Sequence, residues 1–355
     1  MADGFSGSYL PDDVTFLLKP VMLAPTPVAE KERLIQSGRH YSEMVAPEHP
    51  PEPEYLRLYH QALARNGARL GADVATLAAT IVEAMPGRDV VIASLARAGT
   101  PIGVLLRRTL ASLGVPITHY SISIIRGRGI DRVALAHIAA RHDPADVVFV
   151  DGWTGKGAIA AELRHSLRDR SLGFAPRLAV IADPAGCADM AATADDYLIA
   201  SGLLNGVVSG LVSRSILSAV TVGPGDFHAC VTYPQHADGD LSRAFVDTVA
   251  PLALGPAAPN RAHAALRPAL RAECEAMVAG VMAATGTADR DRIKPGIAEA
   301  TRALLRRVPE RLFVRDRQDP DVAHLLHLAA SQGVPVESSP AGRYRAVAVI
   351  GKVGE

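Results

Sequence analysis

The sequence has few cysteines and no long apolar run. Its three cysteines, Cys187, Cys230 and Cys274, are far apart and odd in number, which excludes a disulfide framework and the usual zinc-ligand spacings. No uninterrupted apolar stretch approaches the ~20 residues that span a bilayer. The first residues, MADGFSGSYLPDD, contain neither the basic nor the apolar region of a signal peptide. We therefore expect a cytoplasmic protein that does not enter a membrane.

An excess of one charge is also missing. The 37 basic side chains equal the 37 acidic ones, so no overall field attracts nucleic acid or anionic lipid, although a local basic patch is compatible with this balance. Hydrophobic residues make up 48% of the 355 residues. That share is enough for a buried core, and the length suits two domains.

Apolar runs that end in small or charged residues recur along the chain. They are PGRDVVIASLARAG (86–99), ADVVFVDG (145–152) and RLAVIADPAG (177–186), with a further strand pattern at 115–124. Helical patterns occupy 55–85, 100–114, where Thr100 is the expected cap, 133–142 and the residues up to about 170. The alternation predicts an α/β fold with a mainly parallel sheet, whose ligands bind at the carboxyl ends of the strands.

The alanine- and proline-rich segment PLALGPAAPNRAHAALRPA (251–269) indicates a boundary. Beyond it the pattern restarts with helices at 295–307 and 320–332 and strands at 311–316, 334–337 and 345–351. We expect a large domain over 1–250, a linker with a helix over 251–284, and a small α/β domain over 285–355.

The stretch VVFVDGWTGKGA (147–158) suggests a ligand site. A glycine-rich turn between strand and helix presents backbone N–H groups to a phosphate, and a carboxylate at the strand tip accepts hydrogen bonds from sugar hydroxyls. We predict a ribose 5-phosphate pocket made by Asp151, Thr154, Gly155, Lys156 and Gly157. The spacing fits neither a Walker A loop nor a dinucleotide fingerprint. The alternative is a tight turn with a helix cap and no ligand.

This loop resembles the ribose-phosphate loop of type I phosphoribosyltransferases, and SLARAGTPIG (94–103) looks like their pyrophosphate loop. Together with GSYLPDDVTFLLKP, HYSEM, SIIRGRGID and LLNGVVSGLVSR, the likeness covers roughly residues 5–250. More specifically, it points to the phosphoribosyltransferase family linked to tellurium-resistance operons, which is also named the cysteine protease StiP family.

The resemblance implies a pentosyl (glycosyl) transferase that uses phosphoribosyl pyrophosphate with Mg²⁺ and an unknown acceptor, in a stress pathway that makes or remodels a nucleotide-like metabolite. It implies that Asp151, Arg126 and Arg128 act in catalysis. It also places the pyrophosphate against Arg97, Ala98, Gly99 and Thr100. A protein metal ligand is not expected, and a homodimer is left open. The apolar, helix-like stretch 195–214 and the segment after it offer acceptor-selecting candidates: Asn205, Ser209, Arg214, His228 and Cys230.

Two other functions stay open. Gly152 stands where the family pattern has a second acid. A regulatory protein that binds a sugar phosphate without catalysing a reaction therefore stays an alternative. A cysteine protease needs a thiolate activated by a neighbouring base. Cys187 lies near a strand end, and Cys230 follows His228 by two residues, so either cysteine is a candidate.

The C-terminal stretches KPGIAEATRALL (294–305), LFVRDRQDPDVAHLLHLAASQGVPVE (312–337) and YRAVAVIG (344–351) resemble the Pelota-type RNA-binding domain, a relative of the L7Ae-like fold. The resemblance implies an RNA partner bound at Lys294, Gly296, Glu299 and Arg302. The alternative is an ordinary solvated helix face.

Overall fold

The larger sheet of the protein is parallel throughout. The structure, a computed structural model, describes residues 4–338 and 342–351. Its six-stranded sheet has the order β1, β4, β3, β7, β8, β9, and every neighbouring pair is parallel. The strands are β1 (Thr15–Leu17), β3 (Val90–Leu95), β4 (Ile117–Ile122), β7 (Val147–Trp153), β8 (Leu178–Ala182) and β9 (Met190–Thr193). The predicted α/β fold with a mainly parallel sheet is confirmed.

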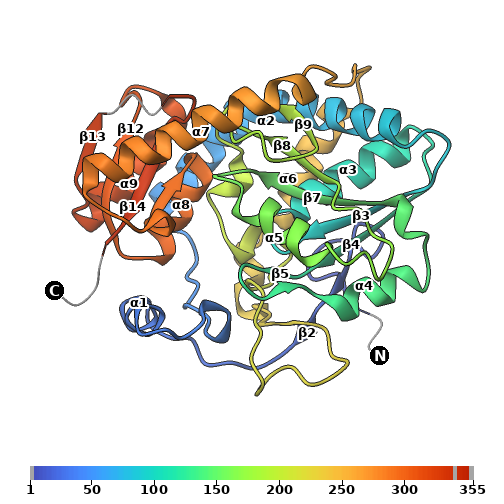
Figure 1. The fold of residues 1–355 in the computed structure, drawn as a ribbon, viewed down its shortest axis with the longest axis horizontal. Helices are drawn as coiled ribbons and strands as arrows, with labels where there is room; N and C mark the ends of the chain where they lie inside the picture. The colour runs from blue at the N-terminus through green and yellow to red at the C-terminus, as the bar shows by residue number, and fades with distance from the viewer. Residues whose placement is uncertain (1–3, 339–341, 352–355) are drawn as a thin grey trace.

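Helices cover both faces of this sheet (Figure 1). On one face lie α2 (Pro53–Ala84), α3 (Thr100–Ser112) and α6 (Ser242–Val249), and on the other lie α4 (Arg132–Ala139) and α5 (Ala158–Ser166). In β7, Val148 and Val150 face the first helix layer, whereas Val147 and Phe149 face the second. A strand buried on both faces needs a continuous apolar run, and this is why the central strands are recognisable in the sequence.

The N-terminal segment up to about residue 50 runs from the sheet of the larger domain to the C-terminal unit. After β1, the short β2 (Lys19–Pro20) pairs with β10 (Ala229–Cys230). The chain then passes through α1 (Val28–Gln36) and η1 (Tyr41–Glu43), which lie below the C-terminal unit in Figure 1. Glu32 on α1 accepts a hydrogen bond from Arg307 of that unit, with 2.8 Å between Oε1 and the guanidinium. A small antiparallel pair, β5 (Ile124–Ile125) and β6 (Gly129–Ile130), follows β4.

The expectation of a helix over 195–214 is wrong. The segment contains only the short 3-10 helices η3 (Ala200–Gly202) and η4 (Gly206–Val208). Gly210 takes a left-handed φ of 80°, which interrupts any regular helix. The apolar side chains of the segment are buried in the core all the same, so the apolar pattern reports burial and not helical periodicity. Further 3-10 helices are η2 (Pro144–Asp146), η5 (Pro234–Gly239), η6 (Ala250–Ala253) and η7 (Arg290–Arg292).

The C-terminal unit is a second, four-stranded sheet. Its order is β11 (Ile293–Pro295), β14 (Ala346–Ile350), β12 (Pro309–Val314), β13 (Val336–Ser338), and β14 is antiparallel to both of its neighbours. The helices α8 (Ile297–Arg306) and α9 (Ala323–Gln332), the latter preceded by η8 (Pro320–Val322), connect its strands. The long helix α7 (His263–Thr285) runs from the larger domain to this unit (Figure 1).

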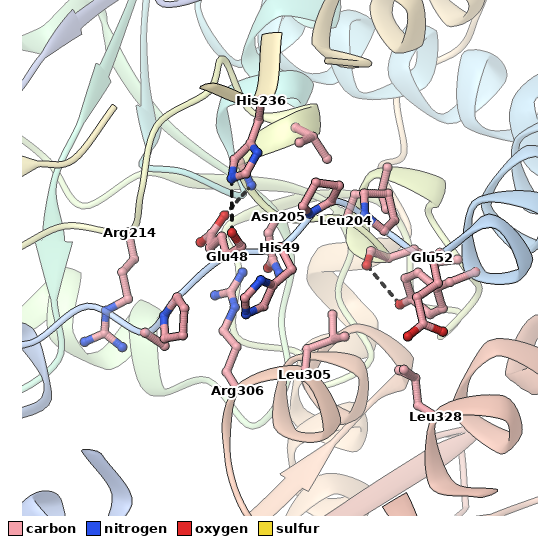
Figure 2. A pocket seen from close by; sticks show the side chains of 18 of the residues that line it. Glu48, His49, Glu52, Leu204, Asn205, Arg214, His236, Leu305, Arg306 and Leu328 are labelled. Carbon is pink, nitrogen blue, oxygen red and sulfur yellow. Dashed lines mark hydrogen bonds between the residues drawn. The ribbon is translucent and has the colours of Figure 1, made fainter. Parts of the chain in front are cut away.

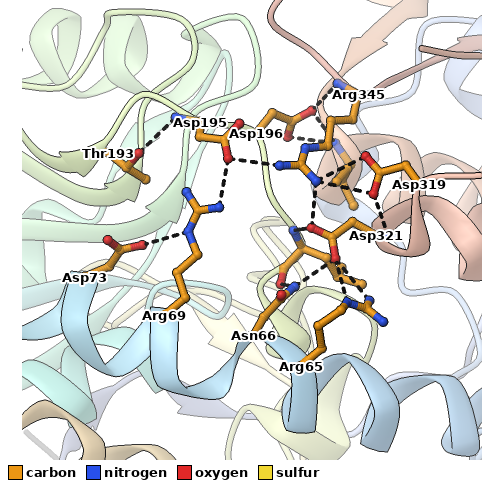
Figure 3. Close-up of polar contacts among 12 residues, drawn as sticks. Arg65, Asn66, Arg69, Asp73, Thr193, Asp195, Asp196, Asp319, Asp321 and Arg345 are labelled. Atoms are coloured by element: carbon orange, nitrogen blue, oxygen red, sulfur yellow. Dashed lines mark hydrogen bonds and ion pairs between the residues drawn. The ribbon is translucent and has the colours of Figure 1, made fainter. Parts of the chain in front are cut away.

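The two units share one hydrophobic core and one polar interface. Ile297, Leu304 and Leu325 of the C-terminal unit belong to the same buried cluster as Leu203 of the larger domain. Figure 3 shows the polar part, in which acidic residues of both units alternate with arginines. Among the described residues, no helix combines the length and the apolar character that a membrane crossing requires.

Candidate functional site

The predicted phosphate turn forms between β7 and α5, but its side chains are already engaged. Thr154 donates from Oγ1 to Oδ1 of Asp183 at 2.5 Å. Lys156 donates from Nζ to the carbonyl of Ile293 at 2.9 Å, and the hydroxyl of Tyr344 donates to the carbonyl of Gly155 at 2.6 Å. The C-terminal unit therefore holds this turn directly.

Asp151 lies two residues before the end of β7, in a cavity of about 300 Å³ between the two units. Burial raises the pKa of Asp151 to about 6, and its Oδ1 accepts from the backbone N–H of Gly152 at 2.8 Å. Three of the four residues predicted for RNA line the same cavity as those predicted for the sugar phosphate, and Gly296 does not. The shared lining includes Asp151, Thr154, Gly155, Lys156, Gly157, Lys294, Glu299 and Arg302.

The predicted pyrophosphate loop is packed and internally bonded. The N–H of Gly99 donates to the carbonyl of Leu95, and that of Thr100 donates to the carbonyl of Arg97, each at 3.0 Å. Thr100 is not the helix cap that the sequence suggests, because Gly99 occupies the N-cap position. The hydroxyl of Thr100 instead lies 2.8 Å from that of Ser121.

Three arginines predicted around the pyrophosphate have carboxylate partners. Arg97 is buried and pairs with Glu48, with 3.0 Å between NH1 and Oε2. Arg126 pairs with Asp291 at 2.9 Å and Arg128 with Glu43 at 3.0 Å. Ala98 lines a neighbouring cavity of about 190 Å³ together with Arg97. These loops are therefore held by protein contacts.

The start of α8 faces the larger domain. Gly296 has a left-handed φ of 93°, and the following N–H, of Ile297, donates to Oδ1 of Asp196 at 3.1 Å. Glu299 accepts from Arg302 at 2.6 Å. The guanidinium of Arg302 lies 4.8 Å from the centre of the Trp153 ring, a cation–π contact. The helix that the sequence assigns to RNA thus covers the end of β7.

The three thiols differ in access. Cys230 is 0% exposed and Cys274 is 2% exposed, whereas Cys187 is partly exposed. Burial raises the pKa of Cys230 to about 12. The ring of His228 bonds to Ser123, with 2.7 Å between Nδ1 and Oγ, so the Cys230–His228 arrangement suggested by the sequence does not present a reachable thiol.

Asp183, at the end of β8, organises the loop that carries Cys187. Its Oδ1 accepts from the N–H of Cys187 at 2.9 Å, and its Oδ2 lies 2.9 Å from Nε2 of His263. Burial alone would raise the pKa of Asp183, but hydrogen bonds from His263 and Thr154 hold it below the ordinary value. The sequence signal for Asp183 was an acid at a strand end, whereas His263 lies in the supposed linker and gave none.

No group of three or more His, Cys, Asp or Glu side chains gathers as a metal site would require within the described residues.

Comparison with known proteins decides the family. The family model described as "Tellurite-like stress resistance cysteine protease StiP" matches residues 7–250. A protein of Acinetobacter baylyi named "Cysteine protease StiP" is 42% identical over all of this chain and 96% of its own length. The chain belongs to the StiP family. The model "PELOTA RNA binding domain" matches residues 272–352, so this StiP-family chain also carries a Pelota match at its C-terminus.

The prediction of a phosphoribosyltransferase, and of a glycosyltransferase in general, is contradicted. Both the family model and the relative from Acinetobacter baylyi are named for a cysteine protease, and the relative spans the whole chain. The misleading signal was the glycine-rich turn after β7, which serves here as a contact for the C-terminal unit. The expectation of magnesium depends on the rejected substrate and loses its basis with it.

Solved phosphoribosyltransferases resemble the StiP-family chain only weakly. A mutant hypoxanthine phosphoribosyltransferase from Trypanosoma cruzi in complex with the product IMP has a TM-score of 0.31 and 14% identity, covering 48% of this chain and 84% of its own. An alanine mutant from an analysis of an invariant aspartic acid in HPRTs has a TM-score of 0.29 and 15% identity, covering 36% and 77%. Likeness at this level carries no argument about activity.

Proposed function

We propose that this chain is a cysteine peptidase and that Cys187 is its nucleophile. The 42% identical relative from Acinetobacter baylyi, which matches the whole chain, is named as a cysteine protease. A peptide bond can be attacked only by a thiol that it reaches. Among the described cysteines Cys187 alone is not buried, and this accessibility beside an Asp–His pair is the observation that carries the proposal.

The surroundings of Cys187 suit a developing negative charge. Its sulfur lies against Gly157, the residue from which α5 begins. The first N–H groups of a helix have no partner within it, and the helix dipole is positive at that end. These N–H groups would favour both the thiolate and the oxyanion of a tetrahedral intermediate. Burial and the charge of Asp183 raise the pKa of the Cys187 thiol, and the positive charges of Arg271 and Arg164 offset only part of that rise.

Asp183 connects the nucleophile with the base. One oxygen of this carboxylate holds the backbone of Cys187, and the other holds Nε2 of His263. With its proton on Nε2, His263 has Nδ1 free of a proton, and we assign to Nδ1 the role of general base. It takes the thiol proton as sulfur attacks the carbonyl carbon, and it returns that proton to the departing amine. Water then hydrolyses the thioester.

The structure represents the resting thiol. Sγ of Cys187 donates to the carbonyl of Ala185 at 3.3 Å. Burial, and then the charge of Asp183, raise the pKa of Cys187 to about 11. The thiol is therefore protonated at neutral pH, and the reaction depends on transfer of its proton to His263.

The test is proteolysis by the purified full-length chain. Fluorescent casein serves as substrate, and mass spectrometry of the chain itself records any cleavage of its own backbone. We expect Cys187→Ala to lower the rate by at least about 1,000-fold, as expected for loss of a nucleophile. Cys230→Ala and Cys274→Ala are matched controls that remove buried thiols and should keep the rate. His263→Ala should lower kcat more than it changes KM, provided that the thermal unfolding curve is retained.

Activity that persists in Cys187→Ala would overturn the assignment of the nucleophile. If a variant with all three cysteines replaced by alanine also remained active, the chain would not be a cysteine peptidase.

A second function is RNA binding by the C-terminal unit, and the family model over residues 272–352 favours it. In this proposal the unit is a Pelota-type domain. Lys294 and Arg302 lie in the cavity between the units, so RNA would enter this cavity as a single strand. Fluorescence polarisation with a short labelled RNA should show affinity that falls steeply with salt. Arg302→Gln should weaken binding and the exposed Arg317→Gln should not; salt-independent binding, or none, argues against it.

A further inference from the structure

A second cavity, of about 290 Å³, lies apart from Cys187. It forms where residues 45–55, the turn at 203–207 and the helices α8 and α9 meet, and Figure 2 shows its lining. One part of the lining is apolar: Tyr55, Leu203, Leu204, Leu305 and Leu328. The other part carries the basic side chains of Lys31, Arg214 and Arg306. The cavity therefore has an apolar wall and a cationic end.

The acidic residues near the cationic end already accept hydrogen bonds from other groups. Glu48 accepts from Arg97 at 3.0 Å and from the N–H of Gly206 at 2.9 Å. Glu32 accepts from Arg307. In Figure 2 the head of Arg306 points toward the middle of the pocket and that of Arg214 lies to its left. Two arginines in one pocket thus lack a carboxylate of their own among the described residues.

The guanidinium groups of the two arginines also have N–H donors that are unpaired among the residues described. Nε of Arg306 and Nε of Arg214 are buried without a partner in the described part of the chain. Within residues 4–338 and 342–351, the Arg214 side chain donates only to the carbonyl of Tyr41, and it stacks on the Tyr41 ring, 4.4 Å from the ring centre. Lys31 is 2% exposed, and the charges of Arg214, Arg306 and Arg307 act on it and lower its pKa further after burial. Buried cations without partners are costly, and an anion between them removes that cost.

We propose that this cavity binds a phosphate monoester with an apolar or aromatic body. The phosphate would lie between Lys31, Arg214 and Arg306, and the body would lie against Tyr55, Leu204 and Leu305. A dianionic phosphate matches several cations in one pocket better than a single carboxylate does, and guanidinium groups bind its oxygens in pairs. The volume is that of a small-ligand pocket. The proposal does not depend on the peptidase reaction.

The charges of the pocket side chains are consistent with binding of a phosphate. Burial first, and then the neighbouring cations, lower the pKa of Lys31 to about 7 and that of Arg306 to about 9. Arg306 therefore stays charged at neutral pH, while Lys31 is partly protonated. A bound phosphate would favour the charged lysine.

The experiment is calorimetric titration of the full chain with three probes: phenyl phosphate, benzoate and inorganic phosphate. We expect phenyl phosphate to bind most tightly, because only this probe combines the dianion with an apolar body. Arg306→Gln should weaken its binding by at least about 10-fold, the loss expected for a charge-assisted hydrogen bond. Leu305→Trp, which fills the apolar part, should weaken phenyl phosphate more than inorganic phosphate.

The control distinguishes this pocket from the cavity beside Asp151, which Lys31, Arg214 and Arg306 also reach. Trp153 lines that other cavity but not this one. Trp153→Leu should therefore leave the affinity for phenyl phosphate within about 2-fold. Absence of heat with every probe, equal binding of benzoate, or a loss in Trp153→Leu as large as in Arg306→Gln would overturn the proposal.

Discussion

Arg65 on α2 and Asp321 on η8 form an ion pair across the two units, with 3.0 Å between NH2 and Oδ1 (Figure 3). Asp321 is 4% exposed and also accepts from Asn66, from the backbone N–H of Leu198 and from Arg345. One buried carboxylate thus receives hydrogen bonds from α2, from the segment before η3 and from the residue before β14. It fixes how the C-terminal unit lies on the larger domain.

We expect Asp321→Asn to destabilise the protein by about 2–4 kcal/mol, because it removes the buried negative charge that accepts from Arg65, Asn66 and Arg345. Urea unfolding monitored by circular dichroism measures this loss. The matched control is Arg57→Gln, which breaks an exposed pair with Glu54 and should cost under about 0.5 kcal/mol. Equal effects of the two substitutions would show that Asp321 does not hold the interface.

The central strands could be predicted because each is buried on both faces. The run VVFV in β7 is short, rich in β-branched residues and followed by a glycine-rich turn, which favours a buried strand over a buried helix. The edge strands β1 and β9 and the short β11 could not be predicted, since they have three or four residues each and depend on a neighbouring strand. The interface between the two units could not be predicted for a similar reason. In the sequence Asp321 and Arg345 are indistinguishable from exposed surface charges, and only the contact between the units buries their ion pair.

The candidate site could likewise be predicted only in part from local sequence. Asp183 was recognisable as an acid at a strand end, and Cys187 as a nearby thiol. His263 lies 80 positions away from Asp183, and only the path of the chain into α7 brings it to the carboxylate. The glycine-rich turn lies between β7 and α5, as its sequence predicts, but local sequence does not indicate that Tyr344 and Ile293 contact it.

Asp151 should reduce stability at neutral pH. Burial raises its pKa to about 6, so between about pH 4 and 6 the folded state binds more protons than the unfolded state, and stability falls as pH rises through this window. We expect Asp151→Asn to stabilise the protein at pH 7 by about 1–2 kcal/mol and to have little effect at pH 4. The expected gain is limited because Asp151 is partly exposed and lines the cavity. Urea unfolding at both pH values checks this, and a gain that is equal at pH 4 would contradict the titration.

Lys31 should give the opposite profile. Burial and the nearby arginines lower its pKa to about 7, so above this value the unfolded state binds the extra proton and stability rises with pH up to about 10. Below pH 7 both states are charged, and the full cost of the buried cation remains. We expect Lys31→Met to stabilise the protein on the order of 3 kcal/mol at pH 6, and less at pH 9. Unfolding at these two pH values tests it, and a pH-independent effect would contradict it.

Alkylation should distinguish the three thiols. Cys187 is partly exposed and its pKa is raised to about 11, so the fraction of thiolate grows about tenfold per pH unit from pH 7 to 10. We therefore expect iodoacetamide to modify Cys187 at a rate that rises over this range without a plateau, while Cys230 and Cys274 react only after unfolding. Mass spectrometry of peptides from the treated protein measures each site, and Cys187→Ser is the control for assignment. A plateau near pH 7 would mean that the resting thiol has already given its proton to a base such as His263. In that case the hydrogen bond from Sγ to Ala185 would not describe the resting enzyme.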